Sequence, residues 1–299
     1  MGEEIASSER TRSGHLAHLI SRERLLAASV ALLFMLGVSF FGLRWVEKAI
    51  TFHPVRYVPG EAWVVPDGAH DVWITTADRV RLHGWFFETR VQPKFPTVIF
   101  FHGNGGNITN VGWVGERLSA RGFQVLLFDY RGYGRSDGTI GDERGLYLDA
   151  DAAYDFVTRN ERPENVILYG QSLGTTVAAD VGSRRQCGAM ILESGLASAS
   201  DMAASVLPWF PRSLHFLLRN RFESAGKLRQ VKSPVLITHG DPDPVIPTEQ
   251  GRLLFAAANE PKKLIIFPGA GHNVFGSLGD IYLTQISEFI QDSTSVQPR

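Results

Sequence analysis

The sequence has little cysteine and no excess of charge. Its 299 residues include one cysteine, Cys187. This excludes a disulfide within the chain and any zinc site built from several cysteines, so we expect Cys187 to be a small residue of the core or of a helix end. The 30 basic and 31 acidic residues give a formal net charge of -1. This balance gives no electrostatic reason to expect nucleic acid as a partner.

One long stretch near the N-terminus lacks charge altogether. Residues 25–43 are 19 residues rich in Leu, Val, Phe and Ala. As a helix rising about 1.5 Å per residue, they roughly span the hydrocarbon layer of a membrane. We therefore expect a transmembrane helix or signal anchor over 25–43, after a polar tail at 1–24. A cleaved signal peptide is the alternative, because Gly37-Val38-Ser39 is a passable cleavage site. A buried globular helix is a third interpretation, which the lack of a polar face disfavours.

Basic residues beside this run indicate its orientation. Within about 20 residues of the run, four precede it and three follow it. This small excess favours a cytoplasmic N-terminus, with the large domain outside the cytoplasm. The residues counted are Arg10, Arg12, Arg22 and Arg24 before the run, and Arg44, Lys48 and Arg56 after it.

The rest of the chain predicts one α/β domain over residues 51–292, which opens with an irregular connector at 51–68. Two apolar segments flanking a tight turn, 72–75 and 80–87, predict an antiparallel start to the sheet. From Thr97 onward, continuous apolar runs alternate with helical patterns. This alternation is typical of a mostly parallel sheet covered by helices on both faces. The predicted parallel strands are 97–101, 124–128, 165–169, 189–192, 234–238 and 263–267.

Residues 197–231 interrupt the alternation, because they hold more chain than one crossover helix needs. Long insertions in compact domains are often lids over a site. We therefore expect a short lid-like insertion or part of a substrate channel here. The alternative is an ordinary packed crossover helix with a proline-rich entry.

Residues 165–174 combine a short apolar strand with the pattern Gly-Gln-Ser-Leu-Gly, and small residues that open a helix follow. A G-x-S-x-G pattern in this setting is typical of a nucleophile elbow, a tight and strained turn that exposes the serine. The helix N-terminus behind it favours developing negative charge. We therefore assign Ser172 as the nucleophile. Ser136 lies in a second match to the pattern, but a glycine-dense loop follows it instead of a helix, so we interpret Ser136 as a loop residue.

A serine hydroxyl needs a base that takes its proton, and the base needs a carboxylate that orients it. Behind such an elbow the acid and the base follow in chain order, each on a loop after a later strand. The last two predicted strands are followed by Asp243 and by a glycine-flanked His272. We assign His272 as general base and acid, and Asp243 as its carboxylate. Asp241 is the alternative acid, and His239 is expected to be a buried structural residue.

The transition state also needs two N–H donors for its oxyanion, each worth roughly 3–4 kcal/mol. One should be the amide of Leu173, directly after the nucleophile, and the other should come from the loop after strand 97–101. That loop reads His-Gly-Asn-Gly-Gly-Asn over residues 102–107. We expect the amide of Asn104 to serve, with Gly103 as second choice. A phosphate cradle is disfavoured, because the loop lacks the lysine and Ser/Thr of a P-loop.

These segments together resemble the α/β-hydrolase family over about residues 51–290. Within that family, the chain is similar to membrane-anchored serine hydrolases that include protein depalmitoylases and monoacylglycerol or lysophospholipid lipases. The resemblance implies that residues 129–136 form a structural loop near the site. Gln171 departs from it, because relatives often carry arginine there, and residues 194–197 replace a common Pro-Phe variant. The matching motifs are FHGNGGN at 101–107, DYRGYGRS at 129–136, the Ser172 elbow, LES at 192–194, the Asp243 loop and GAGHN at 269–273.

The sequence thus predicts a serine hydrolase that cleaves a carboxylic ester or thioester through an acyl-enzyme. No metal or organic cofactor is implied. The apolar N-terminal run and the apolar insertion suggest a lipid-like acyl substrate at a membrane. One alternative is a serine peptidase or amidase that uses the same three residues. A second is a catalytically silent, membrane-tethered binding domain, although such a domain has no need of Ser172, Asp243 and His272 together.

Overall fold

A computed structural model describes residues 2–92, 95–206, 209 and 211–294. Residues 207, 208 and 210 of the expected insertion, and Met1 of the expected tail, lie outside the described residues. The chain divides into two compact units, Met1–Ile50 and Thr51–Arg299. Each unit is described by itself.

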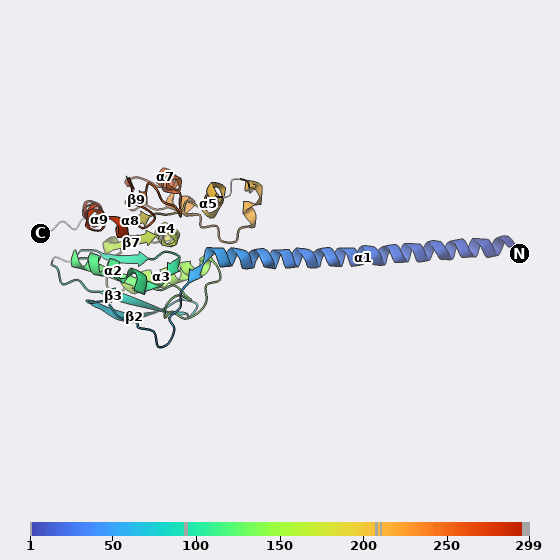
Figure 1. Cartoon of the computed structure of the whole chain (residues 1–299), viewed down its shortest axis with the longest axis horizontal. Coiled ribbons are helices and arrows are strands. Elements are labelled where there is room, and N and C mark those ends of the chain that lie inside the picture. The colour runs from blue at the N-terminus through green and yellow to red at the C-terminus, as the bar shows by residue number, and fades with distance from the viewer. Residues whose placement is uncertain (1, 93–94, 207–208, 210, 295–299) are drawn as a thin grey trace. The chain divides into compact units, whose positions relative to one another are not determined.

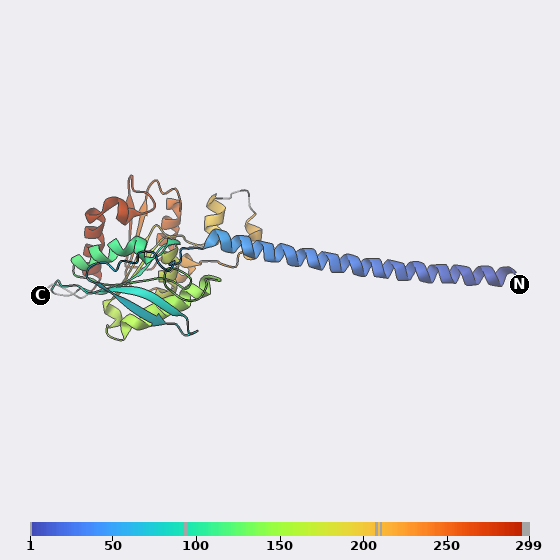
Figure 2. The same ribbon diagram turned by 60° about the horizontal axis from the view of Figure 1, so that its bottom comes forward.

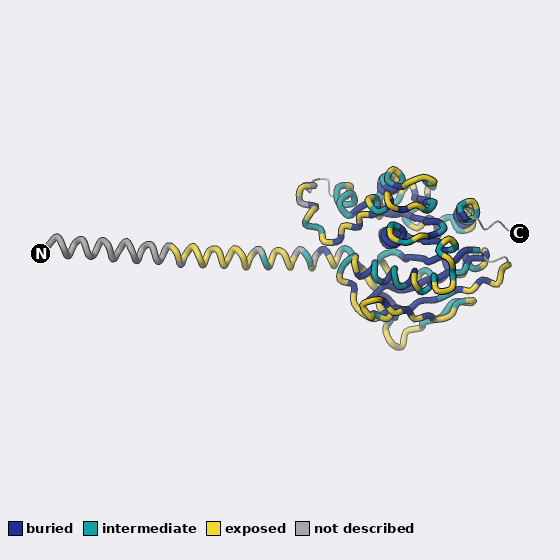
Figure 3. The backbone as a smooth tube through the Cα atoms, turned by 180° about the vertical axis from the view of Figure 1, so that it is seen from behind, coloured by how far each residue is buried: buried dark blue, intermediate teal, exposed yellow. Residues whose placement is uncertain are grey.

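The first unit consists of helix α1, Gly2–Thr51, which continues to the first residue of the second unit. The helix begins inside the segment that we expected to be a polar tail. Within its stretch Arg24–Ala49, an 18-residue window has a mean hydropathy of 2.3, with none of that window buried. Most of the described residues in this stretch are exposed to solvent (Figure 3). By length and composition, the stretch could cross a membrane or serve as a signal sequence.

The second unit is built on an eight-stranded sheet in the order β10-β9-β8-β7-β4-β6-β3-β2 (Figure 1). Its first two strands, β2 (Ala69–Thr75) and β3 (Arg81–Phe87), form an antiparallel pair, and β3 also pairs antiparallel with β6. All other neighbours are parallel, which confirms the predicted sheet. The remaining strands are β4 (Thr97–Phe101), β6 (Gln124–Phe128), β7 (Val166–Gln171), β8 (Ala189–Glu193), β9 (Val235–Gly240) and β10 (Lys262–Phe267).

Helices cover both faces of this sheet (Figure 2). Successive side chains of a strand point to opposite faces. In β4, accordingly, Ile99 and Phe101 pack into one core cluster, with α3, α4 and α7, whereas Val98 and Phe100 pack into the other, with α2, α8 and α9. This burial on both faces is the physical reason for the continuous apolar runs. The helices are α2 (Ile108–Ala120), α3 (Glu143–Thr158), α4 (Leu173–Arg184), α7 (Thr248–Ala257), α8 (Val274–Leu278) and α9 (Asp280–Ser293).

The connector at 51–68 is more ordered than the sequence indicated. It contains the short strand β1 (His53–Pro54), which pairs with β5 (Gly105–Gly106) in the loop after β4. Further on, Tyr57 N–H donates to the carbonyl oxygen of Gly134 at 2.9 Å. The two segments that the connector contacts lie in loops far away in the sequence, so no local sequence pattern predicts these contacts.

The insertion between β8 and β9 folds as α5 (Ala199–Val206), the 3-10 helix η2 (Arg212–Leu217) and α6 (Ser224–Leu228). Its two ends are tied together, because Ala225 N–H donates to the carbonyl oxygen of Ala197 at 2.9 Å. Trp209 and Phe216 remain 76% and 66% exposed. The insertion is therefore a separate cluster of short helices rather than one packed crossover helix.

Candidate active site

Ser172 occupies the sharp turn between β7 and α4. Its backbone angles are φ 53° and ψ −120°, a region that costs a non-glycine residue strain energy. Glycine is required on both sides of it. A Cβ added to Gly174 would overlap the carbonyl oxygen of Phe101, and one added to Gly170 would overlap the backbone of Gly174. The turn is held from the neighbouring strand, since Ser172 N–H donates to the carbonyl oxygen of Glu193 at 2.9 Å.

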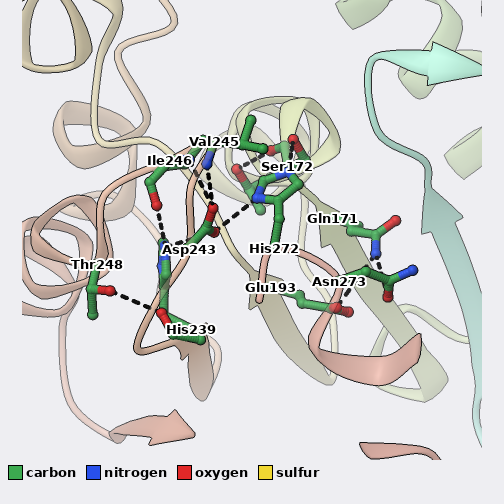
Figure 4. Close-up of polar contacts among 12 residues, drawn as sticks. Gln171, Ser172, Glu193, His239, Asp243, Val245, Ile246, Thr248, His272 and Asn273 are labelled. Carbon is green, nitrogen blue, oxygen red and sulfur yellow. Dashed lines mark hydrogen bonds and ion pairs between the residues drawn. The ribbon is translucent and has the colours of Figure 1, made fainter. Parts of the chain in front are cut away.

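The structure brings together the three residues expected to carry the chemistry (Figure 4). His272 Nε2 lies 2.9 Å from Ser172 Oγ, and His272 Nδ1 lies 2.8 Å from Asp243 Oδ2. Asp243 and His272 stand on the loops after β9 and β10, at the carboxyl ends of parallel strands. The imidazole side chain is 25% exposed, whereas the carboxylate is fully buried. A substrate can therefore reach the serine–histidine end of this chain of hydrogen bonds, while its acidic end is shielded from water.

The Asp243 carboxylate is held in its ionised form. Burial by itself would raise its pKa, but hydrogen bonds from His239, His272 and the amides of Ile246 and Val245 outweigh burial and lower the pKa below its ordinary value. The two amides donate to Oδ1 at 2.9 and 2.8 Å. A carboxylate that stays charged at neutral pH stabilises a positive imidazolium beside it.

His239 and Asp241 occupy supporting positions, as the sequence indicated. The buried His239 ring places Nε2 at 2.8 Å from the carbonyl oxygen of Ile246 and at 3.2 Å from Asp243 Oδ2. Both are acceptors, so Nε2 carries the proton and donates. The Asp241 carbonyl oxygen accepts a hydrogen bond from Thr248 Oγ1 at 3.0 Å, and the Asp241 side chain is exposed. His239 thus supports the buried carboxylate, and Asp241 shapes the turn.

The two backbone amides expected to form an oxyanion hole belong to Leu173, directly after Ser172, and to Asn104, in the loop after β4. Leu173 is the first residue of α4, where an amide has no acceptor inside the helix. Asn104 follows Gly103, and a Cβ added to Gly103 would lie 3.5 Å from the Ser172 Cβ. Within the part of the chain that the structure describes, neither amide has a hydrogen-bond acceptor. Both donors are therefore available to a substrate oxygen.

Ser136, the other serine in a matching motif, is a structural residue in this fold. It is buried, its Oγ–H donates to the carbonyl oxygen of Asp129 at 2.6 Å, and the Oγ accepts from His83 N–H at 2.9 Å. The hydroxyl thus ties the loop after β6 to β3.

We expect Ser136→Ala to destabilise the fold and to leave the chemistry unchanged. The substitution leaves a buried N–H and a buried carbonyl without their partner, which costs about 1–3 kcal/mol. Denaturant unfolding measures the loss of stability, and turnover of a model ester at a temperature where the variant is folded measures the chemistry. A stable Ser136→Ala protein with no activity would contradict the structural role.

Two buried carboxyl groups near the site belong to the motifs at 129–136 and 192–194, but the sequence assigned neither of them a role. Glu193, at the end of β8, accepts hydrogen bonds from Tyr169 Oη–H and, at 3.0 Å, from the amide of Phe275. Burial raises the pKa of Glu193. Asp129 lies 3.7 Å from the buried His102 ring. Burial raises the pKa of Asp129 to about 8 and lowers that of His102 to about 4. Both carboxyls support loops that carry site residues, and only burial distinguishes them from surface acids.

With this geometry established, comparison with known proteins assigns the family. Residues 92–227 match the family Hydrolase_4, described as serine aminopeptidase, S33. The protein Rv2307c of Mycobacterium tuberculosis is 34% identical over 260 residues, which cover 86% of this chain and 91% of that protein. The α/β hydrolase domain-containing protein WAV2 of Arabidopsis thaliana is 30% identical over 241 residues, covering 74% and 78%.

Solved structures agree on the fold. An esterase of Pyrococcus furiosus, Pf2001, superposes with a TM-score of 0.65 at 23% identity, and the match covers 82% of this chain and 98% of the esterase. The chain belongs to the α/β-hydrolase family, and the family and its structural neighbours support an ester hydrolase activity.

Proposed function

We propose that the protein is a serine hydrolase that cleaves a carboxylic ester or thioester through an acyl-enzyme. One observation carries the proposal: an unbroken series of hydrogen bonds runs from Ser172 through His272 to the buried Asp243, and it starts at a strained elbow. A serine in this setting has the base and the orienting carboxylate that make its hydroxyl nucleophilic.

Each residue takes one role in the reaction. Ser172 Oγ attacks the acyl carbonyl carbon as His272 Nε2 accepts its proton. The amides of Leu173 and Asn104 donate to the oxyanion, and Asp243 stabilises the imidazolium. His272 then gives the proton to the leaving alcohol or thiol as the carbon–oxygen or carbon–sulfur bond breaks. Water repeats the attack on the acyl-enzyme and releases the acid, which restores the free serine.

We also propose that the substrate is lipid-like and is met at a membrane, as in the membrane-anchored depalmitoylase and monoacylglycerol lipase group. Two features support this. The exposed apolar stretch of α1 is suited to a single-pass anchor, with the catalytic domain outside the cytoplasm, and the 197–231 insertion exposes Trp209 and Phe216. We assign the insertion as a lid whose apolar side chains contact the acyl chain.

The acyl preference tests this substrate class. The full chain, reconstituted in bilayer nanodiscs, is assayed with 4-nitrophenyl esters and matched thioesters from two to sixteen carbons. We expect kcat/KM to rise about tenfold or more from short to long chains, because each buried methylene contributes about 0.8 kcal/mol. Equal rates on short soluble esters and long-chain esters would refute the lipid-like substrate and leave the ester hydrolase intact.

A peptidase or amidase is the second candidate, because the matching family is described as a serine aminopeptidase. An amide nitrogen is a poorer leaving group than an alcohol or thiol. The rate of amide cleavage therefore depends on whether His272 is placed to give its proton to that nitrogen. Matched ester and amide substrates with the same acyl group separate the two activities. Faster cleavage of the amide would favour the peptidase, and failure to cleave any of these substrates would favour a silent binding domain.

A further inference from the structure

The residues that directly follow helix α1 contact the loop that carries Asn104. Helix α1 ends at Thr51, and strand β1 starts two residues later with His53. In parallel register, His53 stands opposite Gly105, and Val55 N–H donates to the carbonyl oxygen of Gly106 at 3.3 Å. The segment that directly follows the helix is therefore paired with the loop that carries Asn104.

The Asn104 side chain is held on two sides. Its Oδ1 accepts from His53 N–H at 3.0 Å and from Tyr133 Oη–H at 3.1 Å. Its Nδ2 lies 2.9 Å from His53 Nδ1. Since Nδ2 carries only hydrogens to give, it donates, and Nδ1 is the unprotonated nitrogen of the imidazole. His53 therefore supplies both a donor and an acceptor to one amide group.

This restraint matters because the backbone around Asn104 is rich in glycine. Gly103 precedes it, and Gly105 and Gly106 follow it. Glycine accepts many backbone conformations, so these residues give the loop little rigidity of their own. The peptide that carries the Asn104 amide is held at its carbonyl end, where His102 Nδ1 lies 2.7 Å from the Gly103 oxygen. An oxyanion donor acts only when it is aimed in advance at the position of the developing charge. Side-chain contacts must then supply the rigidity that the backbone lacks.

We propose that His53 is a positioning residue for the oxyanion hole, which acts by holding the Asn104 side chain and thereby the direction of the Asn104 amide. The proposal rests on the proposed function, in which that amide stabilises the transition state. Among the described residues, no hydrogen bond joins His53 to Ser172, so His53 acts through Asn104. His53 lies two residues after α1, in the strand that pairs with the Asn104 loop.

Three variants of the full chain isolate this contact. His53→Phe keeps a planar ring but removes the acceptor, whereas His53→Asn places an oxygen at the same number of bonds from Cα as Nδ1. Asn104→Ala keeps the backbone amide and removes every side-chain contact. His70→Phe, at an exposed histidine of β2, is the matched control. For each variant we measure kcat, KM, the midpoint of thermal unfolding and the affinity for a trifluoromethyl ketone, which forms a tetrahedral adduct with the serine.

We expect kcat to fall about tenfold in His53→Phe and about 100-fold in Asn104→Ala. The largest fall expected is the one caused by losing one oxyanion donor completely. KM should change less than about twofold, because a misdirected amide weakens the transition state and not the bound ester. The affinity for the ketone should fall by the same factor as kcat. His53→Asn should recover most of the activity, and His70→Phe should match the parent protein. A purely structural role would lower the unfolding midpoint without this parallel loss.

Two results would overturn the proposal in distinguishable ways. If His53→Phe and Asn104→Ala keep the parental kcat and ketone affinity while Ser172→Ala is inactive, the positioning role is wrong and the serine hydrolase stands. If Ser172→Ala retains the parental activity, the proposed function fails, and the positioning role fails with it.

Discussion

Replacing Ser172 with alanine should abolish both turnover of esters and labelling by a fluorophosphonate probe. The probe reacts only with an activated serine, and the structure gives Ser172 Oγ the base that activates it, His272 Nε2 at 2.9 Å. Removing the nucleophile of such a triad lowers kcat by about 10⁴-fold or more. The fold should survive, because the lost atom is one half-exposed hydroxyl and the backbone strain at this position is the same for serine and alanine.

The informative control is Ser136→Ala, which changes the serine of the second matching motif. Intact protein and Ser136→Ala should both be labelled, with only Ser172→Ala unlabelled. Labelling that survives in Ser172→Ala and is lost in Ser136→Ala would overturn the elbow assignment. An intact, folded protein that is never labelled would favour the silent binding domain.

Replacing Asp243 with asparagine should lower kcat by about 10⁴-fold with little change in KM. The carboxylate accepts from His272 Nδ1 at 2.8 Å, which leaves Nε2 free to take the serine proton. An asparagine can present its NH₂ group to Nδ1 instead, and the histidine then carries its proton on Nε2, facing Ser172. That tautomer cannot act as a base. Asp241→Asn is the matched control, since this nearby acid is exposed, and it should keep full activity.

The same variant makes a prediction about stability and pH. The pKa of Asp243 is lower in the folded protein than in the unfolded chain, where an aspartate has a pKa of about 3.9. Its ionised form therefore stabilises the fold above about pH 4, and this contribution is lost as the pH falls below the unfolded-state pKa. Denaturant unfolding of the parent and of Asp243→Asn at pH 6, 4 and 3 checks this. The parent's advantage should shrink with acid, and a constant difference would contradict it.

The three residues that we propose as catalytic could be picked out from the sequence because their signals are local. Ser172 follows a buried strand and precedes a helix of small residues, and the glycines beside it are needed for a close backbone approach. Asp243 and His272 each follow a strand in the expected order. Parallel strands bring their carboxyl ends to one edge of the sheet, so residues about 100 positions apart, such as Ser172 and His272, converge without any pairing signal of their own.

The supporting contacts gave no such signal. His53 and Asn104 are 51 residues apart, and the segment that holds His53 reads as an irregular connector. Glu193 directly follows a predicted strand, but its burial and its contacts with Tyr169 and Phe275 depend on how β7, β8 and α8 pack. When a side chain contacts loops that are distant in the sequence, the residues beside it show no pattern that would predict the contact.

The sequence by itself determined the class of fold, the elbow turn and the chain order of Ser172, Asp243 and His272, because strand periodicity and glycine spacing can be read from adjacent residues. Only the tertiary structure decided which carboxyls are buried, that Ser136 ties a loop to β3, and that the connector holds the oxyanion loop. These features depend on desolvation and on hydrogen bonds between segments that meet only after the sheet has formed. Burial depends on how the segments pack in the assembled fold, so it cannot be predicted from any single segment of the sequence.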